Sequence, residues 1–271
     1  MKSLPSWHPI SINMIFSILK ELSAECPWRD TLHWYNETGS TNTDAKKLAE
    51  NGAPHGTVVL AGHQTAGRGR MGRQFLSPAG TGIYMSVILR PEQKATGLMH
   101  LTCAAAVAMC DAVEAVCGFR PQVKWINDLV WQNKKLGGIL TELSVKSDGT
   151  VNYAIVGIGI NVLAAPEEMV HIADCLSSAA GQTIDPAKLA AAMIHAMSQL
   201  ELSQKQAIMD RYRSNCLTLG KEVVILRADQ KQYGKALSIS DDGDLTVELT
   251  DGSLVSVSSG EVSVRDMYGY V

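Results

Sequence analysis

Glycines and arginines alternate in a segment between two β-rich runs, Val58–Ala61 and Ile83–Leu89. Within Gln64–Arg73, three glycines and three arginines fall within seven consecutive positions. The glycine spacing matches the dinucleotide-binding fingerprint, but that motif has to open a crossover helix. Residues 75–82 instead lead into the next strand with proline and glycine throughout, and no Gly-Lys-Ser/Thr of a P-loop follows. The segment therefore predicts a loop between two strands and argues against a doubly wound nucleotide-binding fold.

The following residues predict a central sheet covered by helices. Apolar residues from Leu98 to Val116 recur every three or four positions, which places them on one face of a helix. The segment Asp185–Arg213 is similar, with Asp185 as a helix N-cap and Pro186 at the first helical position. Further short β-rich runs are typical of strands: Val123–Trp125, Leu129–Trp131, Gly138–Leu143 and Tyr153–Ile160.

After Gly220 the pattern changes to short runs in which apolar and polar residues alternate. Turns rich in aspartate and glycine separate the later runs. About fifty residues of this kind predict a small all-β barrel. Before the sheet, an amphipathic stretch from Ile10 to Leu22 predicts a helix followed by a linker. We therefore expect an N-terminal helix and linker in residues 1–30, a main domain in 31–218 and a C-terminal β-barrel domain in 219–271. The predicted C-terminal strands are Glu222–Leu226, Lys235–Ile239, Leu245–Leu249 and Leu254–Val257.

Composition restricts the class of protein further. The 271 residues carry a formal charge of -3, so no overall field attracts nucleic acid or an anionic membrane. Six cysteines show no Cys-x-x-Cys pair, and Cys103, Cys110 and Cys117 recur within the apolar helical pattern, where we expect small core residues rather than a redox cluster. The N-terminus lacks the apolar stretch of a signal peptide, and we expect a cytoplasmic location.

The glycine–arginine segment is suited to an anionic ligand. Glycines allow backbone N–H groups to approach phosphate oxygens, and Arg68, Arg70 and Arg73 offer bidentate donors to phosphate or carboxylate. The alternative for this segment alone is a solvated basic loop.

Two later segments add polar residues to predicted strands. Lys124–Leu129 and Lys134–Leu140 predict a hairpin in which Asp128 has a Mg²⁺ role and Lys135 neutralises a reacting anion. Taken alone, this segment is better explained by the alternative of an ordinary hairpin with exposed charges. The run Gly157–Val162 ends a strand with small residues, which leaves room for a ligand beside it.

Together and in this order, these segments resemble the biotin protein ligase family over about Ser40–Arg265. Ser40-Thr41-Asn42 falls where the family has Ser-Thr-Asn, and residues 260–265 resemble its C-terminal strand. The resemblance implies an α+β fold like that of class II aminoacyl-tRNA synthetases, with a mixed central sheet packed with helices and a C-terminal SH3-like β barrel. It also implies an enzyme that uses ATP and Mg²⁺ to convert biotin to biotinyl-5'-AMP. The biotin is then passed to a lysine of a biotin carboxyl carrier protein.

The resemblance also assigns roles to residues. Arg70 and Lys135 would be the catalytic residues, and Asp128 would help to hold Mg²⁺. The biotin site would consist of Ser40, Thr41, Asn42, Gln64, Gly67, Arg68, Arg70, Lys135, Gly138 and Gly157. The nucleotide site would consist of Arg70, Arg73, Phe75, Asn127, Lys135, Asn161 and Arg265.

Two positions depart from the family pattern: Ile126 stands where proline is usual, and Phe75 where tryptophan is usual. Both changes keep apolar bulk. The N-terminal stretch is too short for the family's DNA-binding domain, so we expect a monofunctional ligase without a DNA or membrane partner, and a homodimer is left open.

Two alternatives remain at this point. A lipoate protein ligase shares the scaffold, although Ser40, Thr41 and Gln64 favour a polar ring over an apolar dithiolane. A non-catalytic protein would instead use the arginine loop to bind an acidic partner.

Overall fold

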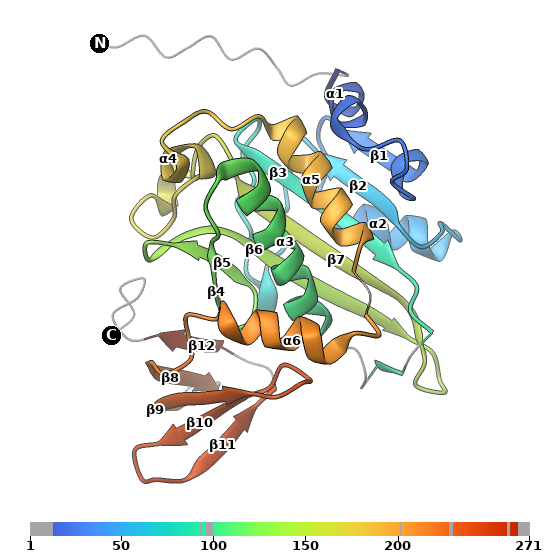
Figure 1. The fold of residues 1–271 in the computed structure, drawn as a ribbon. Coiled ribbons are helices and arrows are strands. Elements are labelled where there is room, and N and C mark those ends of the chain that lie inside the picture. Colours follow the sequence, from blue (N-terminus) through green and yellow to red (C-terminus); the bar gives the residue numbers. More distant parts are fainter. Residues whose placement is uncertain are drawn as a thin grey trace.

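The computed structural model describes residues 13–92, 94–95, 100–200, 202–227, 230–258 and 261–264. Its centre is a seven-stranded sheet with the order β1-β2-β3-β7-β6-β5-β4 (Figure 1). β1 and β2 are parallel and the other neighbouring pairs are antiparallel, so the predicted mixed sheet and α+β class are confirmed. The strands are β1 (Leu32–Tyr35), β2 (Thr57–Ala61), β3 (Gly82–Leu89), β4 (Gln122–Lys124), β5 (Asp128–Trp131), β6 (Lys134–Val145) and β7 (Val151–Asn161).

Helices cover both faces of this sheet (Figure 1). In β7, Ala154 and Val156 belong to the main core with α3 and α5, whereas Tyr153 and Ile155 pack with the alanines of α2. This alternation places α2 on the opposite face from α3 and α5. None of the described helices is long and apolar enough to cross a membrane. The helices are α1 (Asn13–Glu21), α2 (Thr41–Glu50), α3 (Leu101–Cys117), α4 (Leu176–Ala180), α5 (Pro186–Ser198) and α6 (Lys205–Ser214).

The prediction of one helical segment over 185–213 is wrong, because two separate helices occupy these residues. The predicted start is confirmed, because Asp185 accepts a hydrogen bond from the Ala187 N–H and Pro186 occupies the first turn. The helix ends at Ser198, and α6 begins only at Lys205. After the break, α6 packs on α3 and runs between α3 and the C-terminal sheet (Figure 1). Its buried residues include Ile208 and Tyr212.

The C-terminal region is all β, as predicted. Its five antiparallel strands have the order β11-β10-β9-β8-β12. Gly243 and Gly252 have φ values of 94° and 83°, which suits glycine at the turns that precede and follow β10. The strands are β8 (Glu222–Arg227), β9 (Gln230–Ile239), β10 (Leu245–Leu249), β11 (Leu254–Val257) and β12 (Glu261–Val264).

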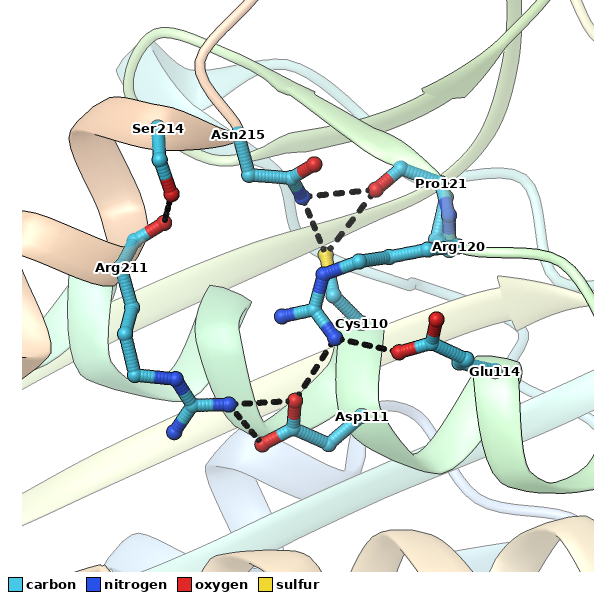
Figure 2. Close-up of polar contacts among 8 residues, drawn as sticks. All are labelled: Cys110, Asp111, Glu114, Arg120, Pro121, Arg211, Ser214 and Asn215. Atoms are coloured by element: carbon cyan, nitrogen blue, oxygen red, sulfur yellow. Dashed lines mark hydrogen bonds and ion pairs between the residues drawn. The ribbon is translucent and has the colours of Figure 1, made fainter.

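A polar cluster fixes α6 to α3 (Figure 2). Arg211 donates to both carboxylate oxygens of Asp111 at 2.6 and 2.7 Å, and Arg120 pairs with Asp111 at 2.8 Å and with Glu114 at 2.7 Å. Asn215, just after α6, donates to the carbonyl of Pro121 at 2.7 Å. This cluster holds the start of β4, the strand that leads into the predicted hairpin.

The six cysteines are free and buried. Cys103, Cys110 and Cys117 are 0, 0 and 7% exposed within α3, which confirms the interpretation as core residues.

Candidate active site

The floor of a cavity of about 400 Å³ is formed where side chains give way to glycines on β7. Ile155 fills the α2-facing side of this strand, and Gly157 and Gly159 follow on the same face. A Cβ at Gly157 would overlap the Asn42 amide, and a Cβ at Gly159 would overlap the Phe75 ring. These glycines are therefore required for α2 and the arginine loop to approach the sheet.

A buried polar wall stands at one end of the cavity. Ser40, Thr41 and Asn42 begin α2 and are 4, 3 and 5% exposed. Gln64 Oε1 accepts from the Thr41 backbone N–H at 2.9 Å and from the Thr41 hydroxyl at 3.1 Å. Gln64 Nε2 donates to the Ser77 hydroxyl at 2.8 Å. Because these contacts fix the Gln64 amide, the wall presents a defined set of donors and acceptors.

The glycine–arginine loop folds over the same cavity. The Gly67 carbonyl accepts from the Phe75 N–H at 2.9 Å, and the Gly69 N–H donates to the Arg73 carbonyl at 2.7 Å. A Cβ at Gly67 would overlap the Phe75 carbonyl, so glycine is needed for this closed loop. Arg70 reaches from the loop to Asn127 Oδ1 at 3.1 Å, which joins it to the segment before β5.

A lysine and an aspartate face the cavity from the β5–β6 hairpin. Its turn is formed by Gln132 and Asn133, with φ values of 46° and 62° as in a type I′ hairpin. Asp128 lies opposite Gly138 in the register, and beside that glycine Lys135 Nζ lies 2.7 Å from Asp128 Oδ1. The predicted hairpin is confirmed.

Comparisons with known proteins identify the family to which the chain belongs. The Biotin/lipoate A/B protein ligase family matches residues 35–161, and the Biotin protein ligase C terminal domain matches residues 218–265. The biotin–[acetyl-CoA-carboxylase] ligase of Mycobacterium tuberculosis is 34% identical over 253 residues, covering 89% of this chain and 91% of that protein. The chain belongs to the biotin protein ligase family.

Two further family members extend the comparison. The bifunctional ligase/repressor BirA of Bacillus subtilis is 38% identical over 232 residues, covering 82% of this chain and 70% of that protein. The structure of the biotin protein ligase from Aquifex aeolicus in complex with biotin and ATP matches with a TM-score of 0.72 at 31% identity, covering 87% of this chain and 98% of that one. The family resemblance inferred from the motifs is confirmed.

Most residues that the family resemblance singled out meet in the cavity. Gly67 lies behind the lining, packed against the Phe75 backbone. Asn161 also lies outside the lining and donates to the Asp174 carbonyl at 3.1 Å. Arg265 falls outside the described residues. The predicted residues that line the cavity are Ser40, Thr41, Asn42, Gln64, Arg68, Arg70, Arg73, Phe75, Asn127, Asp128, Lys135, Gly138 and Gly157.

Other residues at the site of this ligase-family chain were not singled out from the sequence. Trp125 lines the cavity and donates its indole N–H at 2.8 Å to the carbonyl of Gly243, in the turn before β10. Met169 and Ile172 line it from the segment after β7. Glu142 on β6 contacts Arg68 and Asn42. A carboxylate between the apolar residues Leu140 and Leu143 of β6 is the signal that could have drawn attention to Glu142.

The donor set suits Mg²⁺ only in part. Asp128 is the single acidic side chain among the described residues that line the cavity. The described residues contain no group of three or more His, Cys, Asp or Glu that could hold a metal ion. Mg²⁺ commonly binds through one or two carboxylates together with substrate phosphates, so Asp128 fits a magnesium ion that a nucleotide brings with it.

Proposed function

We propose that the chain is a biotin protein ligase that activates biotin with ATP and transfers it to a lysine of a biotin carboxyl carrier protein. One observation carries this proposal: a single cavity joins the polar wall of α2, the arginine loop and the Lys135–Asp128 pair. An enzyme that couples a small carboxylic acid to a nucleotide needs these three features next to each other. The Aquifex aeolicus ligase in complex with biotin and ATP and the biotin–[acetyl-CoA-carboxylase] ligase of Mycobacterium tuberculosis support the choice of substrates.

Biotin would bind at the wall formed by Ser40, Thr41 and Gln64. Its ureido ring carries both donors and acceptors, which need partners because each unsatisfied buried polar group costs about 1–3 kcal/mol. Asn42 supports this wall from behind, over Gly157. The valerate chain would then point its carboxylate toward the arginine loop.

The nucleotide would bind between the loop and the β5–β6 hairpin. Arg70 and Lys135 would stabilise negative charge as a biotin carboxylate oxygen attacks the α-phosphorus of ATP and pyrophosphate leaves. Arg73, Phe75 and Asn127 would complete the nucleotide site. No nucleophile of the protein takes part, so catalysis would consist of positioning and charge stabilisation.

Asp128 is the residue that would hold Mg²⁺ together with the phosphates. The ion supplies positive charge that offsets the charge of the triphosphate. In the structure Asp128 pairs with Lys135, so binding of the nucleotide would separate the two and make both available.

The second half of the reaction would occur on the bound adenylate. The neutral amine of the carrier lysine would attack the biotinyl carbonyl carbon, an amide bond would form, and AMP would leave. The carrier protein, a cytoplasmic location, the homodimer and the absence of a DNA or membrane partner stay predictions. We also propose the domain boundaries at residues 30/31 and 218/219.

The test is pyrophosphate release from ATP by the purified chain with biotin, with lipoate, and with neither acid. Of these three conditions, we expect pyrophosphate release only with biotin. A carrier domain that contains its acceptor lysine should then gain the mass of one biotinyl group. A carrier variant with that lysine replaced by arginine is the matched control. Release with lipoate but not biotin would assign the lipoate reaction instead, and no release with either acid would contradict a ligase.

A further inference from the structure

Glu142 lies on the cavity side of β6, one step beyond the residues that line the cavity. Gly138 and Leu140 precede it on the same face, and Leu140 contributes to the lining. The residue between them and Glu142 on the other face, Thr141, accepts a hydrogen bond from Thr102 of α3 at 2.9 Å. The Glu142 carboxylate is therefore directed toward α2 and the arginine loop.

This carboxylate contacts two parts of the site at once. Oε1 lies 2.9 Å from Arg68 Nη2, and Oε2 accepts from Arg68 Nη1 at 3.2 Å. Oε2 also accepts from the Asn42 amide nitrogen at 2.8 Å. The pairing is end-on and bidentate, because both terminal nitrogens of Arg68 contact the two carboxylate oxygens. A bidentate pair is the geometrically specific form of this interaction.

The contact with Asn42 extends into the polar wall. Because Asn42 Nδ2 faces Glu142, its Oδ1 faces Ser86 and accepts from that hydroxyl at 2.6 Å. The Ser86 hydroxyl also lies 2.8 Å from the Thr41 hydroxyl. One acidic residue therefore orients the amide of the wall and holds the loop against it.

We propose that Glu142 is a positioning residue that clasps the arginine loop, through Arg68, to the wall at which biotin binds. In this arrangement Arg68 closes the loop, and contact with the anion falls to Arg70. The inference rests on the proposed function for the identity of the ligand, whereas the clasp itself is a property of the chain.

A different role for Arg68 leads to the opposite result. If Arg68 left Glu142 to bind the biotin carboxylate, then removing the Glu142 charge would release Arg68 for the ligand and strengthen biotin binding. If the pair is a clasp, the same substitution opens the loop and weakens biotin binding. The sign of the change in affinity separates the two roles.

The experiment compares Glu142→Gln with Glu114→Gln in the full chain. Glu114→Gln is the matched control, because it also removes a glutamate paired with an arginine, Arg120, at 2.7 Å and remote from the cavity. For Glu142→Gln we expect the Kd for biotin, measured by calorimetry, to rise about fivefold, as for loss of a partly exposed charged pair. The KM for ATP and the melting temperature should match those of the control.

A protease arm reports on the loop without any ligand. Trypsin cleaves after Arg70 and Arg73, and mass spectrometry follows both cleavages. We expect faster cleavage at these sites in Glu142→Gln than in Glu114→Gln. If the wild-type chain binds no biotin, the proposed function fails, while this arm still decides on the clasp.

A double-variant cycle completes the design. Because Arg68 and Glu142 act as one unit in a clasp, adding Glu142→Gln to Arg68→Gln should change the Kd for biotin and the cleavage after Arg70 and Arg73 no further. The clasp is overturned by equal cleavage rates in Glu142→Gln and the control, by a biotin Kd that stays the same or falls, or by effects of the two substitutions that multiply.

Discussion

Arginines occupy two contrasting regions of this molecule. At the junction of α3 and α6, Arg120 and Arg211 converge on Asp111 from packed, regular elements (Figure 2). In the cavity, Arg68 and Arg70 extend from a loop that depends on Gly67 for its closed form. The arginines of the junction are therefore held by packed, regular elements, whereas those of the cavity extend from a loop with little regular structure.

The contrast teaches that support and surroundings determine what a charge can do. At the junction, Arg211 donates to both carboxylate oxygens of Asp111, and the cluster holds α6 and the start of β4 in place. In the cavity, Arg70 donates to a neutral amide oxygen of Asn127 beside space for a ligand. We therefore expect substitutions at the junction to affect stability and substitutions in the cavity to affect the reaction.

The largest expected effect is that of Arg70→Ala. Removing a charged donor from the site of the reacting phosphate should lower kcat/KM for biotin-dependent pyrophosphate release about 100-fold or more, with loss or leakage of the adenylate. The melting temperature should change little. Arg211→Ala is the control, with near-normal kcat/KM and a lower melting temperature. Comparable kinetic losses in both variants would break the distinction between the two regions.

A smaller effect is expected for Gly157→Ala. Its methyl group would overlap the Asn42 amide, so the polar wall has to shift, which should weaken biotin binding about tenfold. Gly39→Ala is the matched control, because a Cβ there meets no atom within 4 Å. Biotin titrations by calorimetry compare the two variants. Equal affinities would show that the wall tolerates displacement.

The sequence predicted the sheet more fully than the helices on it. The continuous run of apolar residues and glycine in Tyr153–Ile160 is typical of a strand that packs on both faces. The structure extends this strand only to Val151–Asn161. The helix α2 was missed, because the face that it buries consists of small and polar residues, Thr41, Asn42, Ala45 and Ala49. Such a face has little hydrophobic periodicity. The missed β1 has only four residues and no fully buried side chain.

The site was predictable where neighbours in the sequence are also neighbours in space. Asp128 and Lys135 belong to one hairpin, whose turn residues set the register. Glu142 could not be assigned a partner, because Arg68 lies 74 positions and Asn42 100 positions away along the chain. Such contacts depend on the order of strands in the sheet, which pattern alone does not determine.

Asp111→Asn sharpens the comparison from the side of the junction. The substitution leaves Arg120 and Arg211 close together without the carboxylate between them, so the free energy of unfolding should fall by about 1 kcal/mol, a value reduced for the partial exposure of Asp111. Urea unfolding measures this change. The KM for biotin should equal that of the wild-type chain, and an increase comparable to that of Glu142→Gln would contradict the separation of tasks.

The smallest effect is expected for alkylation of Cys110 in the folded chain. This cysteine lies inside the junction cluster (Figure 2). Burial raises the pKa of its thiol from 9.0 to about 12, so at pH 8 the folded chain holds almost no thiolate for reaction. Native iodoacetamide treatment at pH 8 should leave Cys110 unmodified, whereas treatment in denaturant should alkylate it, as mass spectrometry can determine. Because the raised pKa favours the neutral folded form, this contribution to stability is complete below pH 9 and is lost as the pH rises from 9 toward 12. Rapid native alkylation of Cys110 would mean that the junction opens readily, and the contrast between a rigid junction and an adaptable cavity would then be wrong.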